Sequence, residues 1–224
     1  MSARAKADRP ATVVVIGLGR FGTSVALALV QQGVEVLAVD EDLKLVEKWA
    51  DELTRVVAAD STDHQVLQQL GIDSFDSAVV AIGDNIEASV LTVLALAESG
   101  VSDIWAKAIT RNHGRILERV GATTVVYPEF SMGAQVARML AGSMLDYLEL
   151  DDDNCIARTV APAVLWDKPL AESEPDRRYG VTIVGIKLAG EEFAPAHPET
   201  VVRQRDHVIV SGPKPEVEKF CRLQ

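Results

Sequence analysis

The sequence is poor in several features that would assign a protein to a class. Its 224 residues include two cysteines, and aromatic residues make up 5%. No apolar run approaches the about 18 consecutive residues of a membrane-spanning helix, and the polar residues 1–10 lack the apolar stretch of a secretion signal. We therefore expect a cytoplasmic protein with reduced thiols, whose core is built mainly from Val, Leu, Ile and Ala.

Positive charge is also scarce. Lys plus Arg number 22 against 33 Asp plus Glu, which gives a formal net charge of −11. A chain of this charge repels phosphate-rich polymers and anionic lipids, so nucleic acid is excluded as the main partner. A local basic pocket for a small phosphate ligand remains compatible with this composition.

Motifs of catalysis are missing as well. The sequence contains no G-x-S-x-G, H-E-x-x-H or Walker A element, and its two cysteines, Cys155 and Cys221, have no metal-binding spacing. None of the four histidines has a convincing partner for acid–base work; they are His64, His113, His197 and His207. We predict a binding protein and not an enzyme.

Most of the chain alternates between strand-like and helix-like segments. The expected strands are 12–16, 34–39, 56–59, 77–82, 104–109 and 123–127. Helical segments separate them, and this βαβ alternation predicts one doubly wound, parallel, Rossmann-like sheet with helices on both faces. The fold class is therefore α/β.

The pattern changes after Pro128. Residues 131–148 carry one apolar stripe at helical spacing, which predicts a helix that packs either on its own domain or at a subunit interface. The acidic stretch LELDDDN (148–154) then marks a domain boundary, and the remaining sequence predicts a small antiparallel α+β domain. The expected domains are a disordered tail (1–10), the Rossmann-like domain (11–130), the apolar-striped helix (131–148) and a C-terminal domain (149–224).

A glycine-rich motif joins the first expected strand to the first helix. Gly17, Gly19 and Gly22 form G-x-G-x-x-G, with Arg20 and Phe21 inside it, and Asp40 ends the second strand. Glycines let a phosphate approach the backbone, the helix N-terminus favours its charge, and the carboxylate can accept both ribose hydroxyls. The motif predicts an adenine nucleotide without a 2′-phosphate.

Other candidates lie at the same carboxyl edge of the sheet. Arg20 can reach terminal phosphates of its own or a neighbouring subunit's nucleotide, or remain solvated. Asp60 can face the adenine or cap the next helix. The full set of further candidates is Glu41, Asp60, Ser61, Ile82, Gly83, Lys107 and Glu129.

Several stretches in order resemble one family. They are VVVIGLGRFGTSVALAL, VLAVDED, AADSTD, VVAIGDNIEASVLTVLAL, IWAKA and LERVGATTVVYPEFSMG, followed more thinly by RRYGVTIVGIK and RQRDHVIVSGP. Together they resemble the cytosolic regulators of Ktr/Trk potassium uptake, which carry RCK domains. The resemblance is dense over about residues 11–150.

The resemblance implies a mechanism. Such proteins dimerise through a crossover helix, form octameric rings and dock on the inner face of a potassium-translocating membrane subunit. ATP or ADP, or in some members NAD(H), binds the N-terminal lobes and changes the ring. By motif, Gly17, Gly19 and Gly22 hold phosphates and Asp40 holds the ribose, while Arg20 and Lys107 reach the phosphate chain. Glu129 matches a carboxylate that holds Mg²⁺ or Ca²⁺ beside the γ-phosphate.

The C-terminal domain departs from the pattern of relatives that bind cyclic di-AMP. Its stretch LAESEPDRRYG carries Glu172, Glu174 and Asp176, which repel a dianion, although Arg177 and Arg178 lie nearby. Two other readings stay open. One is an NAD(H)-dependent oxidoreductase or NAD(H)-responsive sensor, and the other is a nucleotide-binding ring with a different membrane partner.

Overall fold

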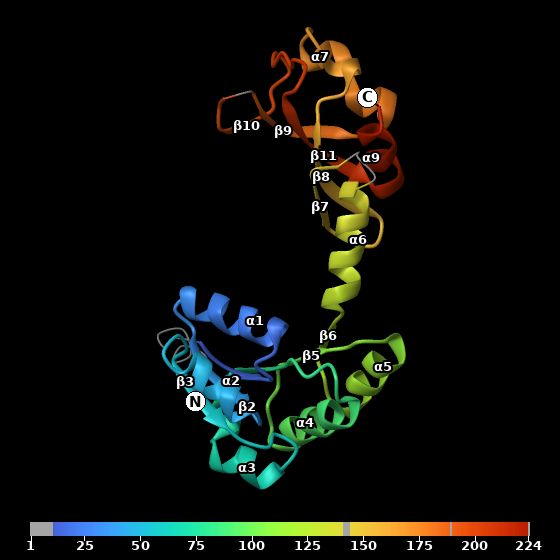
Figure 1. Ribbon diagram of the computed structural model, residues 1–224. Coiled ribbons are helices and arrows are strands. Elements are labelled where there is room, and N and C mark those ends of the chain that lie inside the picture. Colours follow the sequence, from blue (N-terminus) through green and yellow to red (C-terminus); the bar gives the residue numbers. More distant parts are fainter. Residues whose placement is uncertain (1–10, 141–143, 189, 224) are drawn as a thin grey trace, which may run out of the picture. The chain divides into compact units, whose positions relative to one another are not determined.

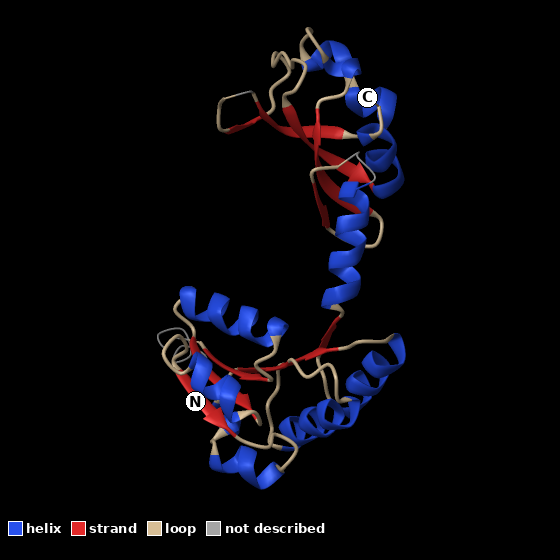
Figure 2. Cartoon of the chain, viewed as in Figure 1, coloured by secondary structure: helices blue, strands red, loops and turns tan. Residues whose placement is uncertain are grey.

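The computed structural model describes residues 11–140, 144–188 and 190–223. The disordered tail expected over 1–10 lies outside the described residues. The chain forms two compact units that divide between Glu129 and Phe130, and each unit contains its own sheet (Figure 1, Figure 2).

The first unit consists of six parallel strands joined by helices. In chain order its elements are β1 (Thr12–Ile16), α1 (Arg20–Gln31), β2 (Glu35–Asp40), α2 (Leu43–Trp49), β3 (Arg55–Ala58), α3 (His64–Gln69), η2 (Ile72–Ser74), β4 (Ser77–Val80), α4 (Ile86–Glu98), β5 (Ile104–Lys107), α5 (Arg111–Val120) and β6 (Thr124–Val126). The strand order is β3-β2-β1-β4-β5-β6. This order confirms the predicted doubly wound parallel sheet.

Both faces of this sheet are buried, which explains why its strands are continuous apolar runs. Alternate residues of a strand point to opposite faces. Val13 and Val15 of β1 pack with Ala26 of α1 in one core, whereas Val14 and Ile16 belong to a second core with Leu96 of α4. Helices α1 and α4 accordingly lie on opposite sides of the sheet (Figure 1).

The helix predicted over 131–148 differs at both ends. Helix α6 runs from Pro128 to Leu140, and β7 occupies Asp146–Glu149; residues 141–143 lie outside the described part. Proline suits the first turn of a helix, where its missing N–H is not needed. Met144 is buried in the core of the second unit, and β7 pairs with residues 155–158. Beyond α6 the predicted apolar stripe thus belongs to the second unit: Met144 lies in its core, whereas Leu148 of β7 is exposed.

The second unit is an antiparallel sheet with short helices, as the α+β prediction requires. Its elements are β7, β8 (Asn154–Val160), η3 (Ala163–Leu165), α7 (Leu170–Ser173), α8 (Pro175–Tyr179), β9 (Thr182–Lys187), β10 (Phe193–Pro195), β11 (His207–Pro213) and α9 (Lys214–Cys221). The strand order is β10-β9-β11-β8-β7. Sequence analysis missed β7 and β10, which are short edge strands.

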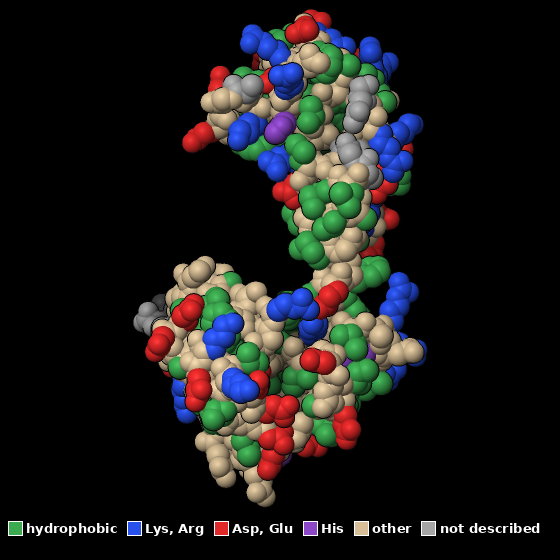
Figure 3. Space-filling view, viewed as in Figure 1, with side chains coloured by type: hydrophobic (Ala, Val, Ile, Leu, Met, Phe, Trp, Pro, Cys, Tyr) green, Lys and Arg blue, Asp and Glu red, His purple; other side chains and the backbone are tan. Residues whose placement is uncertain are grey.

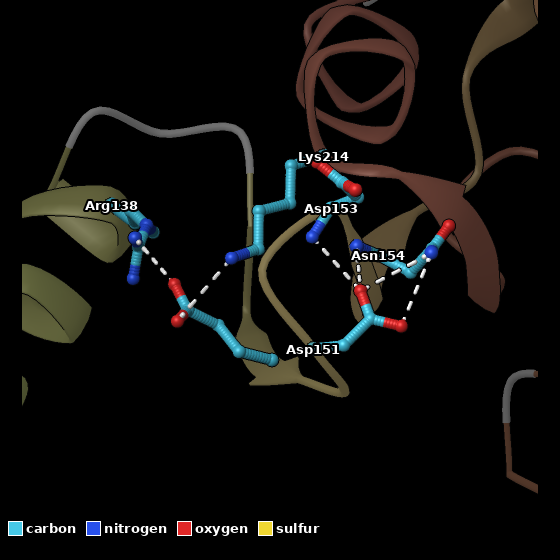
Figure 4. Close-up of polar contacts among 6 residues, drawn as sticks. Arg138, Asp151, Asp153, Asn154 and Lys214 are labelled. Carbon is cyan, nitrogen blue, oxygen red and sulfur yellow. Dashed lines mark hydrogen bonds and ion pairs between the residues drawn. The ribbon is translucent and has the colours of Figure 1, made fainter.

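The last turn of α6 is attached to this second sheet. Glu149 of β7 accepts a hydrogen bond from Arg138 at 3.1 Å and forms an ion pair with Lys214 at 3.5 Å (Figure 4). The Arg138 guanidinium also lies 4.1 Å from the centre of the Tyr147 ring. Beside this cluster, Asp151 accepts bonds from the backbone N–H groups of Asp153 and Asn154, which close the β7–β8 turn.

Candidate functional site

The glycine motif adopts the turn that its spacing predicts. Gly17 has φ +94°, and a Cβ on Gly22 would lie 1.9 Å from the Gly17 carbonyl oxygen, so neither position accepts a side chain without rearrangement. Gly19 is different, because a Cβ there would meet no atom within 4 Å. Its missing side chain leaves open space at the N-cap of α1, where a ligand phosphate can approach the backbone.

Asp40 faces this turn from the end of β2. Its Oδ2 accepts from the Leu18 backbone N–H at 2.5 Å, and its Oδ1 accepts from the Asp42 N–H at 2.8 Å. The carboxylate thus fixes the glycine turn and the following loop in the free protein. A ribose would share these oxygens, since each carboxylate oxygen has two lone pairs.

Asp60 and Ser61 follow β3 at the same edge. One Asp60 oxygen accepts from the Thr62 N–H at 2.9 Å and from the Thr62 hydroxyl at 2.6 Å. These hydrogen bonds hold the pKa of Asp60 below its ordinary value. Ser61 is buried and its hydroxyl lies 2.9 Å from that of Thr92, so this hydrogen bond holds the loop. Asp60 lines a cavity at this edge.

A cavity of about 300 Å³ lies among these residues at the carboxyl ends of the parallel strands. Seven predicted candidates line it: Gly17, Gly19, Asp40, Glu41, Asp60, Ser61 and Ile82. Sequence analysis missed eight further lining residues: Ile16, Leu45, Ala59, Thr62, Ala81, Asp84, Asn85 and Ala88. Asp84 and Asn85 lie in the segment between β4 and α4, so the rule that selected polar residues after the strands, such as Asp60, could have found them.

The other candidates lie outside this lining. They are Arg20, Phe21, Gly22, Gly83, Lys107 and Glu129. Arg20 is exposed at the start of α1, while Gly22 is buried and serves the turn itself. Gly83 is flanked by two lining residues and contacts the Lys107 side chain. The remaining pair, Lys107 and Glu129, forms a second polar group of the same unit.

Lys107 and Glu129 form a short ion pair. The Lys107 Nζ lies 2.7 Å from the Glu129 Oε1. The Lys107 ammonium, together with the more distant charge of Arg20, holds the pKa of Glu129 below its ordinary value. Glu129 is thus acted on by two cations, Lys107 at the end of β5 and Arg20 at the start of α1.

The site offers few ligands for a metal ion. Among the described residues, no three His, Cys, Asp or Glu side chains gather closely enough to hold a metal ion. Glu129 is one carboxylate and is engaged by Lys107. A divalent cation would therefore need most of its oxygen ligands from a bound phosphate chain and water, which is the usual arrangement for Mg²⁺.

None of the helices in the described part of the chain is long and apolar enough to cross a bilayer.

Family comparisons agree with the two-unit division of the chain. A model described as the TrkA-N domain matches residues 13–128, and one described as the TrkA-C domain matches residues 156–224. The chain is 40% identical over 207 residues to a Bacillus subtilis protein named Ktr system potassium uptake protein C, covering 92% of this chain and 94% of that protein.

Solved structures with similar folds include nucleotide-bound proteins. One is described as the GsuK channel bound to NAD, with a TM-score of 0.67 and 19% identity; the match covers 96% of this chain but 40% of that one. Another is a Kef C-terminal domain from Shewanella denitrificans in an AMP-bound form, with a TM-score of 0.51 and 27% identity, covering 58% of this chain and 82% of that one.

Proposed function

Because the chain belongs to the Ktr/Trk family of potassium uptake proteins, in which a TrkA-N domain precedes a TrkA-C domain, we propose that it is the cytosolic, nucleotide-controlled regulatory subunit of a potassium uptake system. The observation that carries this proposal is the cavity at the carboxyl edge of the parallel sheet, with its open glycine turn and Asp40. Ligand binding there would shift the conformation of a subunit that docks on a potassium-translocating membrane protein.

The proposed ligand is ATP or ADP. The two similar structures hold NAD and AMP, which share an adenosine 5′-phosphate, and the cavity offers the groups that such a moiety needs. Asp40 would hold the ribose, Asp60 the adenine amine, and the glycine turn the first phosphate. Beyond the cavity, Lys107 and Arg20 would receive the further phosphates.

A divalent cation at the terminal phosphate belongs to this proposal. Mg²⁺ or Ca²⁺ would neutralise phosphate charge and draw its protein ligand from Glu129. Such a cation would distinguish ATP from ADP, since only ATP brings a γ-phosphate. A ligand that interacts differently in two conformations is what shifts their populations.

Self-association into dimers and an octameric ring is also proposed, supported by exposed apolar side chains. Helix α6 exposes Phe130 (73%), Met132 (56%) and Leu140 (82%), and hydrophobic side chains gather over this helix in Figure 3. Leu91 of α4 and Ile116 of α5 form further exposed apolar positions. Apolar patches of this kind mark contacts with other protein surfaces.

The C-terminal unit gives cyclic di-AMP little to bind. Glu174 lies 3.3 Å from Arg177 and 3.4 Å from Arg178, so it engages both cations of the stretch where such a ligand would sit. The neighbouring hollow is lined by Asp176, which would repel a phosphate. We propose that this unit does not use that ligand.

An NAD(H)-responsive sensor is the second candidate, because one similar structure is bound to NAD. An oxidoreductase is less well supported, since no histidine of the described residues lines the cavity. We propose that the protein is not an enzyme.

Calorimetric titration of the purified protein with ATP, ADP and NADH, with and without Mg²⁺, tests the proposal. We expect ATP and ADP to bind with a cation-dependent difference, and Asp40→Ala to abolish their binding because it removes the ribose acceptor and the brace of the glycine turn. A circular dichroism spectrum should show the variant folded. Unchanged affinity in Asp40→Ala would contradict the site, and tight binding of NADH alone would favour the sensor.

A further inference from the structure

The Lys107–Glu129 ion pair offers an inference that rests on the proposed function and deepens it. We propose that Glu129 is a built-in competitor of the ligand: in the free protein it occupies the ammonium group that a ligand phosphate must take. Nucleotide binding is then an exchange of one anion for another at Lys107. Glu129 is released from the pair when the phosphate arrives.

The two partners of this pair differ in exposure. The Lys107 side chain is 13% exposed, whereas that of Glu129 is 65% exposed. A nearly buried ammonium needs an anion beside it, because an unpaired charge in such a place is strongly unfavourable. Glu129 can turn into water at little cost, so Lys107 is the fixed member and Glu129 is the exchangeable one.

Lys107 lies against the wall of the nucleotide cavity. A Cβ on Gly83 would be 3.0 Å from the Lys107 Nζ and 3.2 Å from its Cε, so the lysine rests directly on this glycine. The neighbours of Gly83 on either side, Ile82 and Asp84, both line the cavity. The ammonium therefore lies within one residue of the space assigned to the nucleotide.

Glu129 also interacts with a second cation. Its carboxylate interacts electrostatically with Arg20, which begins α1 directly after the open Gly19. A phosphate chain that continues from the glycine turn would meet both cations and replace Glu129 as their counter-charge. The released carboxylate would then be repelled by the phosphate unless a divalent cation joined them.

Release of Glu129 also affects helix α6. Glu129 lies in its first turn, where a carboxylate favourably meets the helix dipole. The ion pair to Lys107 holds this turn to the end of β5 in the free protein. Ligand exchange at Lys107 removes that contact. The first turn of α6 is then held to β5 by this ion pair only when the site is empty.

A double-mutant cycle tests the exchange. Calorimetry with ADP in chelator-treated buffer should show Glu129→Gln binding about three- to tenfold more tightly than the parent, since an ion pair of ordinary strength no longer opposes the ligand. Lys107→Gln should weaken ADP binding, and adding Glu129→Gln to it should give no further gain. Glu87→Gln is the matched control, because Glu87 lies in the first turn of α4 and should not change ADP affinity by this mechanism.

Adenosine separates this proposal from the proposed function. It has no phosphate, so its affinity should be equal in the parent and in Glu129→Gln. If adenosine and ADP both fail to bind the parent protein, the nucleotide site itself is wrong. If they bind but Glu129→Gln gains no ADP affinity, or gains no more than Glu87→Gln, the competitor role of Glu129 is overturned.

Discussion

The two units of the molecule present ligand space in different ways. In the parallel sheet of the first unit all strands end at one edge, so Gly17, Asp40 and Asp60 converge although they are distant in sequence. In the antiparallel sheet of the second unit successive strands end at opposite edges. A hollow of about 590 Å³ in this unit is lined instead by strand faces, including Tyr147, Ile156 and Arg158.

This difference decides what a sequence can reveal. A site at a strand edge follows from loop motifs that directly succeed a strand, and such motifs can be read locally. A hollow on a strand face depends on cross-strand pairing, such as Ile209 opposite Arg158, and no local motif marks it. From the sequence of the first unit a function can therefore be predicted, whereas from that of the second mainly the fold can be predicted.

The largest predicted effect separates the two units energetically. Phe220 of α9 is 1% exposed and packs edge-on against Tyr179 with ring centres 5.4 Å apart. We expect Phe220→Ala to lower the free energy of unfolding of the second unit by about 3–5 kcal/mol, while ADP binding to the first unit persists. Denaturant unfolding with and without ADP measures both.

Phe193→Ala is the control for this experiment, because Phe193 is exposed on β10 and its loss should be nearly neutral. Loss of ADP binding in Phe220→Ala would show that the first unit depends on the core of the second.

A smaller effect concerns pH and the first unit alone. His113 is 1% exposed, burial lowers its pKa, and its Nε2 has no partner among the described residues. As the pH falls below the ordinary histidine pKa of about 6.5, His113 becomes protonated in the unfolded chain before it does so in the folded unit. The free energy of unfolding should then fall by up to about 1.4 kcal/mol per pH unit.

His113→Gln should flatten this dependence. Thermal unfolding of the parent and the variant between pH 7.5 and 5.5 measures the slope, and the second unit provides an internal reference. Equal slopes in both proteins would rule out His113 as the group responsible.

The smallest effect concerns the attachment of α6 to the second unit. Arg138 contacts Glu149 and the Tyr147 ring, and both contacts are partly exposed. Arg138→Ala should reduce the stability of the second unit by about 0.5–1 kcal/mol, less at high salt. Arg222→Ala should change it less, since the Arg222–Glu218 distance is 3.8 Å. Denaturant melts at two salt concentrations compare the variants, and equal losses would contradict a specific role for Arg138.

The sequence predicted the first unit well for a physical reason. Strands such as β1 are buried on both faces, so their apolar runs stand out, and glycine and aspartate follow them at fixed places. The observed strand order confirms the predicted doubly wound parallel sheet, and seven of the predicted site residues line the cavity. Asp84 and Asn85 were not among the predicted site residues, although Ile82 and Gly83 of the same segment were.

The rest depended on contacts that local patterns do not contain. Met144 and Leu148 have helical spacing from α6, yet pairing with β8 makes a strand of residues 146–149. The ion pair between Lys107 and Glu129 joins the end of β5 to the first turn of α6, and the sequence placed both residues at the edge without pairing them. The contact of Lys107 with Gly83 is likewise visible only in three dimensions.

The two hydrogen bonds that Asp40 accepts have one more consequence. They hold the glycine turn and the loop after β2 in shape before any ligand is present. Binding of the proposed nucleotide would therefore be preorganised, with little conformational entropy left to lose at this turn. Its affinity would then be set chiefly by the contacts and charges that the ligand itself exchanges.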